Sequence, residues 1–242
     1  MRWMLLFLFL LGSLSAKESK KAPIFVSLGA DCEVANLLRE NQLYPKSYPF
    51  DCIRMLNNQC LIRVLDEDFF QFLDEECCFQ HPFHNSIFAN SRFEIEFEMD
   101  RPFDSEWQDF GSFRHQIEHL DCHFKKRISR FRKLAHSSRR VFFIRAAFDS
   151  DGGVAPLWGS ESHVRINDEQ AWSLREALDR FFPNLRFTLV VINFTEESAP
   201  KIRILNGIIE CKIRRFHKRE DFKRLCNILL NLRKSHRSDL AF

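Results

Sequence analysis

Four short, largely apolar segments recur along the chain, at residues 24–28, 141–145, 187–192 and 208–213. Each has the length of a strand and is apolar on both faces, which is typical of a parallel sheet with helices on both sides. Segments with helical spacing of apolar residues follow or separate them, at residues 33–41, 61–73, 112–134, 167–182 and 220–232. This alternation predicts an α/β fold with a mostly parallel sheet that helices cover on both faces.

Between the second and third of these helices the pattern changes. Phe93, Ile95, Phe97 and Met99 alternate with charged residues, as in a half-buried strand. We therefore expect a β-hairpin-like insertion around residues 79–99 beside the main sheet.

The N-terminus has the features of a signal peptide, with Arg2, an apolar run at residues 4–11 and the small residues Ser13, Ser15 and Ala16. We expect residues 1–16 to be this peptide, residues 17–22 to be a flexible segment, and residues 23–242 to form a single domain. The protein would then be exported, either to a periplasm or out of the cell. An uncleaved N-terminal anchor is the alternative, and no later segment is long and apolar enough to be a transmembrane span.

Charge and cysteine spacing exclude several function classes. A net charge of only +3 gives no case for a nucleic-acid partner. Eight cysteines occur at irregular spacing, which matches neither a disulfide framework nor a C-x-x-C zinc pattern. We expect at most one disulfide, no cofactor and no bound metal.

The strongest local signal is a cysteine at the point where the first strand turns into a helix. Ser27-Leu28-Gly29-Ala30-Asp31-Cys32 places this thiol at the carboxyl end of the strand, where α/β proteins bind ligands. Unpaired N–H groups and the helix dipole at that position favour the thiolate, which is the nucleophilic form. Neighbouring Asp31 and Glu33 oppose this effect, and a small buried cysteine in the turn is the alternative interpretation.

The same residues carry a resemblance to a known family. Residues 25–34, FVSLGADCEV, and residues 47–51, SYPFD, resemble the paired signature of the putative papain-like cysteine peptidases, a bacterial domain of unknown function. More weakly, the strand ending in Arg145 and the strand ending in Asn193 resemble later strands of that family. The resemblance implies that Cys32 is the nucleophile of a cysteine-dependent hydrolase acting on a peptide or another acyl substrate.

The sequence departs from the family where a base is needed. Family members often carry a His-Asp pair after the extended segment, but here Met99 precedes Asp100. A thioether cannot accept a proton and so cannot serve as the base for Cys32. Asp100 or Asp51 would orient a base supplied from elsewhere, and His81 and His84 are the nearby histidines, of which His84 is our candidate.

Three further features leave alternatives open. Cys52 stands where the family usually has an aromatic residue and could pair with Cys32. His115, Glu118 and His119 match the H-x-x-E-H zinc pattern, which makes a zinc-dependent hydrolase an alternative, with Cys122 and His123 one turn further on. Residues 125–140 hold eight basic residues and no acid, which is typical of a solvated helix end or of a surface that binds anions. A catalytically inactive exported binding protein of the same fold is the other alternative.

Overall fold

The computed structural model describes residues 21–29, 31–55, 57–82, 84, 87–98, 112–149, 157–158, 163–197, 199–205 and 207–232. Its main sheet has the strand order β1-β6-β9-β11-β10. The strands are β1 (Ile24–Ser27), β6 (Val141–Ala146), β9 (Phe187–Thr195), β11 (Ile208–Arg214) and β10 (Lys201–Leu205). The first four run parallel and β10 pairs antiparallel with β11, which confirms the mostly parallel sheet.

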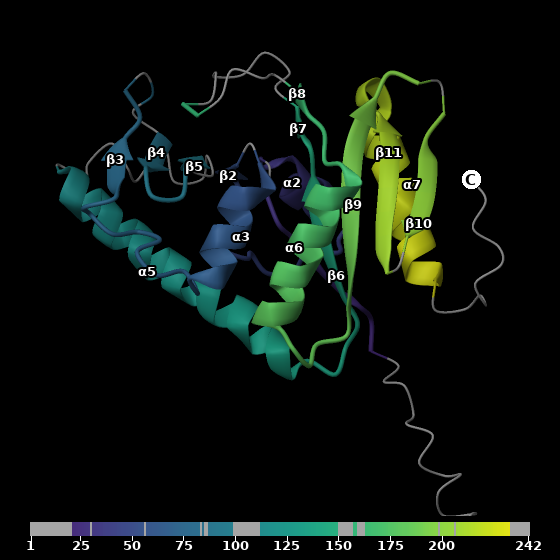
Figure 1. Ribbon diagram of the computed structural model, residues 1–242, viewed down its shortest axis with the longest axis horizontal. Coiled ribbons are helices and arrows are strands. Elements are labelled where there is room, and N and C mark those ends of the chain that lie inside the picture. The colour runs from purple at the N-terminus through teal and green to yellow at the C-terminus, as the bar shows by residue number, and fades with distance from the viewer. Residues whose placement is uncertain are drawn as a thin grey trace, which may run out of the picture.

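Helices lie on both faces of this sheet. They are α2 (Glu33–Glu40), α3 (Asn58–Asp66), α5 (Phe113–Arg132), α6 (Asp168–Phe181) and α7 (Lys218–Asn231), with short 3-10 turns η2 (Lys133–His136) and η3 (Arg215–His217). In Figure 1, α3 and α6 cover one face and α2 and α7 the other, while the long α5 crosses below α3. None of the helices in the described ranges has the length and apolar character needed to cross a bilayer.

A second, antiparallel sheet lies beside the first and contains the strands of the expected insertion around residues 79–99. It has the order β2 (Ile53–Arg54), β5 (Ile95–Glu98), β4 (Ile87–Asn90) and β3 (Cys78–Gln80). The predicted hairpin-like segment is therefore a three-strand meander, and β2 brings the chain just after Asp51 into the same sheet. A short pair, β7 (Phe148–Asp149) with β8 (His163–Val164), follows the end of β6.

Phenylalanine rings fill the space between the sheet and the α5–α6 layer. Phe131 of α5 is fully buried and packs at centroid distances of 5.0–5.9 Å against Phe50, Phe69, Phe143, Phe181 and Phe182. The contacts with Phe50, Phe69 and Phe182 are edge-to-face, a geometry that adds to the free energy gained by burying the rings. Many of the phenylalanines in the described part of the chain are therefore core residues.

Local caps fix the helix starts as the sequence predicts, with one difference in helix length. Ser112 accepts a hydrogen bond from the His115 N–H, and Asn167 forms a capping box with Gln170. The helix expected over residues 61–73 instead spans Asn58–Asp66, because Asn57 caps it earlier and the backbone turns at Asp68 and Phe69, both with positive φ. Phe69 and Phe72 still reach the core, but from turns rather than from a helix.

Candidate functional site

The turn after β1 lies at the carboxyl edge of the main sheet. The Leu28 N–H donates to the Ile144 carbonyl at 2.8 Å and extends the pairing of β1 with β6. The Gly29 N–H then donates to Ser27 Oγ at 3.2 Å, and Gly29 adopts φ of +76°. A left-handed residue at this point redirects the chain from the strand toward α2, and glycine adopts it without steric cost.

The two motifs that resemble the family, residues 25–34 and 47–51, meet at Gly29. A Cβ at this position would lie 3.0 Å from the Phe50 carbonyl oxygen, 3.1 Å from the Ile53 carbonyl oxygen and 3.0 Å from Met55 Cε. Residues 25–34 and 47–51 therefore touch through backbone that only glycine allows to approach so closely. The sequence motifs are separate in the chain and form one structural unit.

Cys32 follows this turn at the N-cap position of α2, and its side chain is half-buried. Its N–H hydrogen-bonds the Asp31 carboxylate, and its carbonyl accepts the Asn36 N–H at 2.9 Å. The first N–H groups of a helix have no acceptor within the helix, so this end of α2 favours a negative charge. Glu33, which the sequence places against that effect, is paired with Lys218 of α7 at 3.2 Å.

The other cysteines differ from Cys32 in exposure. All eight are thiols and none is in a disulfide, so the bridge considered between Cys32 and Cys52 is absent. Five are buried, namely Cys52, Cys60, Cys78, Cys211 and Cys226, while Cys77 is half-buried and Cys122 exposed. Burial raises the pKa of Cys78 and of Cys226 to about 12, which keeps these thiols protonated and unreactive.

Asp51 is buried in the loop that follows α2 and has three polar partners. It accepts the Tyr44 hydroxyl at 2.5 Å and the Tyr48 N–H at 3.2 Å, and lies 3.7 Å from the Arg39 guanidinium. Burial raises the pKa of Asp51 from 3.8 to about 6, although these partners oppose the shift. These contacts give Asp51 a part in ordering the loop that leads from the end of α2 to Phe50, whose carbonyl lies against Gly29. Its role in orienting a base stays a prediction.

Arg145 links the segments around the turn from inside the protein. Its side chain is buried at the end of β6 and donates from Nη1 to the Leu28 carbonyl at 3.2 Å, from Nη2 to the Met55 carbonyl at 2.8 Å and from Nε to Asn58 Oδ1 at 2.9 Å. All three acceptors are neutral, and burial lowers the pKa of Arg145 to about 10. The guanidinium therefore holds β1, the segment after Asp51 and the start of α3 together at the carboxyl edge.

Asn193 has a comparable role at the end of β9. Its amide accepts the Ile166 N–H and donates to the Ile166 carbonyl, both at 2.9 Å, and so fixes the segment before α6. Sequence reasoning noted Arg145 and Asn193 as strand ends but missed these partners, and missed Tyr44 and Asn58. A charged or amide residue closing an apolar strand was the available signal for the first two.

The two candidate histidines lie together in the antiparallel sheet region. His81 is buried, His84 is half-buried, and their rings lie 5.3 Å apart. Burial lowers the pKa of His81, whereas the nearby Glu96 acts in the opposite direction. Glu96 of β5 also forms an ion pair with Arg54 of β2, at 3.4 Å. Met99 and Asp100, where the base motif would stand, lie outside the described residues.

The zinc pattern on α5 has other contacts. His115 Nδ1 lies 3.0 Å from Ser112 Oγ, and the Glu118 carboxylate accepts from Arg114. In the part of the chain that the structure describes, no three or more His, Cys, Asp or Glu side chains are grouped to hold a metal ion. These contacts fit a helix cap and an exposed ion pair.

Comparison with known proteins points to one family. A family model for a putative papain-like cysteine peptidase, a domain of unknown function, matches residues 23–197. The match spans β1 through β9 and includes the Cys32 turn, the Asp51 loop and Arg145. No curated protein and no solved structure matches the chain.

Proposed function

The chain belongs to the putative papain-like cysteine peptidase family, and on that premise we propose that it is a cysteine-dependent hydrolase with Cys32 as its nucleophile. The observation that carries this is the position of the thiol. Cys32 is half-buried at the start of α2, whereas five of the other seven cysteines are buried. A thiol at a helix N-terminus is stabilised as the thiolate and remains open to a substrate there.

The reaction would proceed by acyl transfer. The Cys32 thiolate adds to the carbonyl carbon of a peptide or other acyl substrate, and N–H groups at the start of α2 bind the resulting oxyanion. The carbon–leaving group bond breaks as a general acid protonates the leaving group, which gives a thioester on Cys32. Water then adds to this thioester, the carbon–sulfur bond breaks, and the acid product and the thiol are released.

This chemistry needs a base, for which we propose His84, with Asp51 or Asp100 as the carboxylate that orients it. His84 is half-buried and lies between β3 and β4 of the antiparallel sheet, whose strand β2 begins two residues after Asp51. Export through the N-terminal apolar segment is part of the same proposal. Without an effective base the protein would instead be an inactive binding protein of the same fold.

The test is competitive alkylation of the folded full chain with iodoacetamide between pH 5 and 9, with each cysteine quantified by peptide mapping. Cys122 is the internal control, because it is exposed and lies in the middle of α5 rather than at a helix start. We expect Cys32 to react faster than Cys122 below pH 7 in spite of its lower exposure. Equal or slower reaction of Cys32 at every pH would refute the activated-thiol proposal.

A second measurement separates turnover from binding. A peptidyl epoxide or vinyl sulfone needs both a reactive thiol and a proton donor, so an active hydrolase should be labelled at Cys32 and Cys32→Ser should not. His84→Ala should lower this labelling while leaving iodoacetamide labelling of Cys122 unchanged. Fast alkylation of Cys32 without probe labelling would identify the inactive binding protein.

A further inference from the structure

The basic run at residues 125–140 is not used by the proposed chemistry. Of its eight lysines and arginines, two are in ion pairs, Lys125 with Asp121 and Arg132 with Asp68. Within the described ranges, no ion pair joins an acid to the other six, which are Lys126, Arg127, Arg130, Lys133, Arg139 and Arg140. We call these six residues the basic face.

The basic face is one surface rather than scattered side chains. Lys126, Arg130 and Lys133 recur at i, i+4 and i+7 and share one side of the helical segment, where Arg130 Nε donates to the Lys126 carbonyl at 3.2 Å. Arg130 and Arg139 both lie close enough to Tyr48 to oppose the rise in the pKa of Tyr48 that burial causes. Positive charge from the helix and from the following segment therefore converges beside the same loop.

The loop at this surface supplies little compensating negative charge. Arg127 and Arg39 both act on Asp51, whose side chain is fully buried. A carboxylate in that position offsets charge inside the protein but presents none to a partner outside. Lys126 and Lys133 are exposed, so the outer part of the basic face is open to an anionic surface.

The chain enters the fold at the basic face. Arg139 donates to the carbonyls of Ala22 at 2.5 Å and Pro23 at 3.0 Å, and the Ile24 N–H donates to the Arg140 carbonyl at 2.9 Å. Figure 1 shows the start of β1 and the end of α5 at the same edge of the sheet. Residues 1–20, with their apolar run at residues 4–11, thus join the fold beside this cluster of cations.

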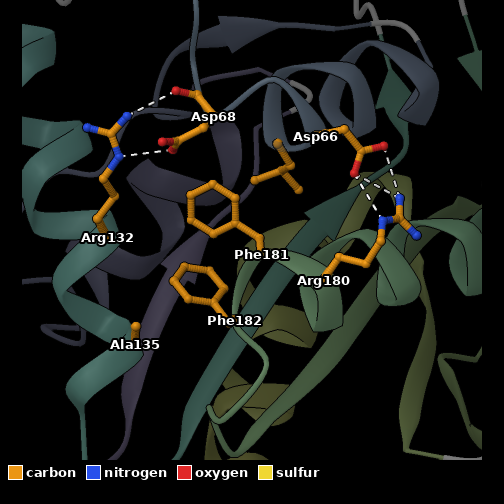
Figure 2. Close-up of a pocket in the computed structure, with 8 residues that line it drawn as sticks. Asp66, Asp68, Arg132, Ala135, Arg180, Phe181 and Phe182 are labelled. Atoms are coloured by element: carbon orange, nitrogen blue, oxygen red, sulfur yellow. Dashed lines mark hydrogen bonds and ion pairs between the residues drawn. The ribbon is translucent and has the colours of Figure 1, made fainter.

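A groove of about 570 Å³ lies at the same edge, and among the described residues its two arginines are in ion pairs, whereas the cations of the basic face are not. Figure 2 shows Phe181 and Phe182 at its floor between two ion pairs, Asp68 with Arg132 and Asp66 with Arg180. Each cation there has a carboxylate partner. An anionic ligand would have to break those pairs, whereas on the basic face it would not.

We propose that the basic face binds an anionic membrane surface, with lipid phosphate groups against Lys126, Arg130 and Lys133. The chain that binds in this way keeps residues 1–16 as an uncleaved anchor. In that chain the apolar run and the basic face act on the same membrane, and their contributions to binding add. The Cys32 turn lies at the opposite, carboxyl edge of the sheet and remains open to solvent-borne substrate.

The test is flotation of the full chain with phosphatidylcholine vesicles that contain or lack phosphatidylglycerol, at low and high salt. Each lysine near an anionic surface contributes about a fivefold factor in partitioning, so Lys126→Glu/Lys133→Glu should lower binding to the anionic vesicles at least ~25-fold. The control is Lys223→Glu/Arg224→Glu, which makes the same change in net charge at exposed positions of α7. This control should retain most of the binding.

The outcomes decide the proposal in either direction. Binding that requires phosphatidylglycerol, falls at high salt and is lost in the Lys126/Lys133 variant supports it. Equal binding to neutral vesicles would mean that the apolar segment alone is responsible, and equal losses in both variants would mean that net charge is responsible. Either result overturns the proposal, as does binding of a nucleic-acid duplex by a chain that binds no vesicle.

Discussion

The buried carboxyl of Asp51 gives a prediction about stability and pH. Its pKa is raised from 3.8 to about 6 by burial, so the folded state binds this proton more tightly than the unfolded state does. Stability from this group is therefore fully present below pH 3.8 and is lost as the pH rises through 6. A shift of roughly two units corresponds to about 3 kcal/mol of unfolding free energy.

Asp51→Asn removes the titration while keeping the shape of the side chain. We expect the unfolding free energy of the wild type, minus that of Asp51→Asn, to fall by about 2 kcal/mol between pH 4 and pH 6.5, because this range covers most but not all of the titration. Urea unfolding followed by tryptophan fluorescence, to which Trp172 contributes from its place against the core, measures this difference. Asp66→Asn is the control, because it removes an exposed ion pair with Arg180 worth at most about 1 kcal/mol. A wild-type advantage that rises with pH would refute the reasoning.

Three other changes test the geometry around the turn. Gly29→Ala should cost about 3 kcal/mol in urea unfolding, since the new Cβ meets the Phe50 carbonyl at 3.0 Å in a left-handed backbone, and an unchanged midpoint would contradict the contact. Arg145→Met should lower the unfolding free energy by about 3 kcal/mol, because three buried acceptors lose their donor, and it should slow the alkylation of Cys32. Unchanged stability would show that water replaces the guanidinium as the donor. Cys78, with its pKa raised to about 12, should react with iodoacetamide about a thousandfold more slowly in the folded than in the urea-unfolded protein, and equal rates would refute its burial.

Features that depend on near neighbours could be read from the sequence. The four strands, the caps at Ser112 and Asn167 and the Gly29 turn are where the pattern predicts them. A cap is decided by a side chain and an N–H three residues away, and a buried strand by its own run of apolar residues. The family resemblance, carried by residues 25–34 and 47–51, is confirmed by a match over residues 23–197.

Features that join distant segments required the tertiary structure. The partners of Arg145 lie 87 to 117 residues away, and the ion pair that offsets Glu33 joins it to Lys218, 185 residues later. The turn at Asp68 and Phe69 replaced the second half of an expected helix, because Phe69 packs against Phe50 and Phe131 from outside any helix. A sequence determines which side chains must be buried, but the partner that satisfies a buried charge depends on which segments the sheet brings together.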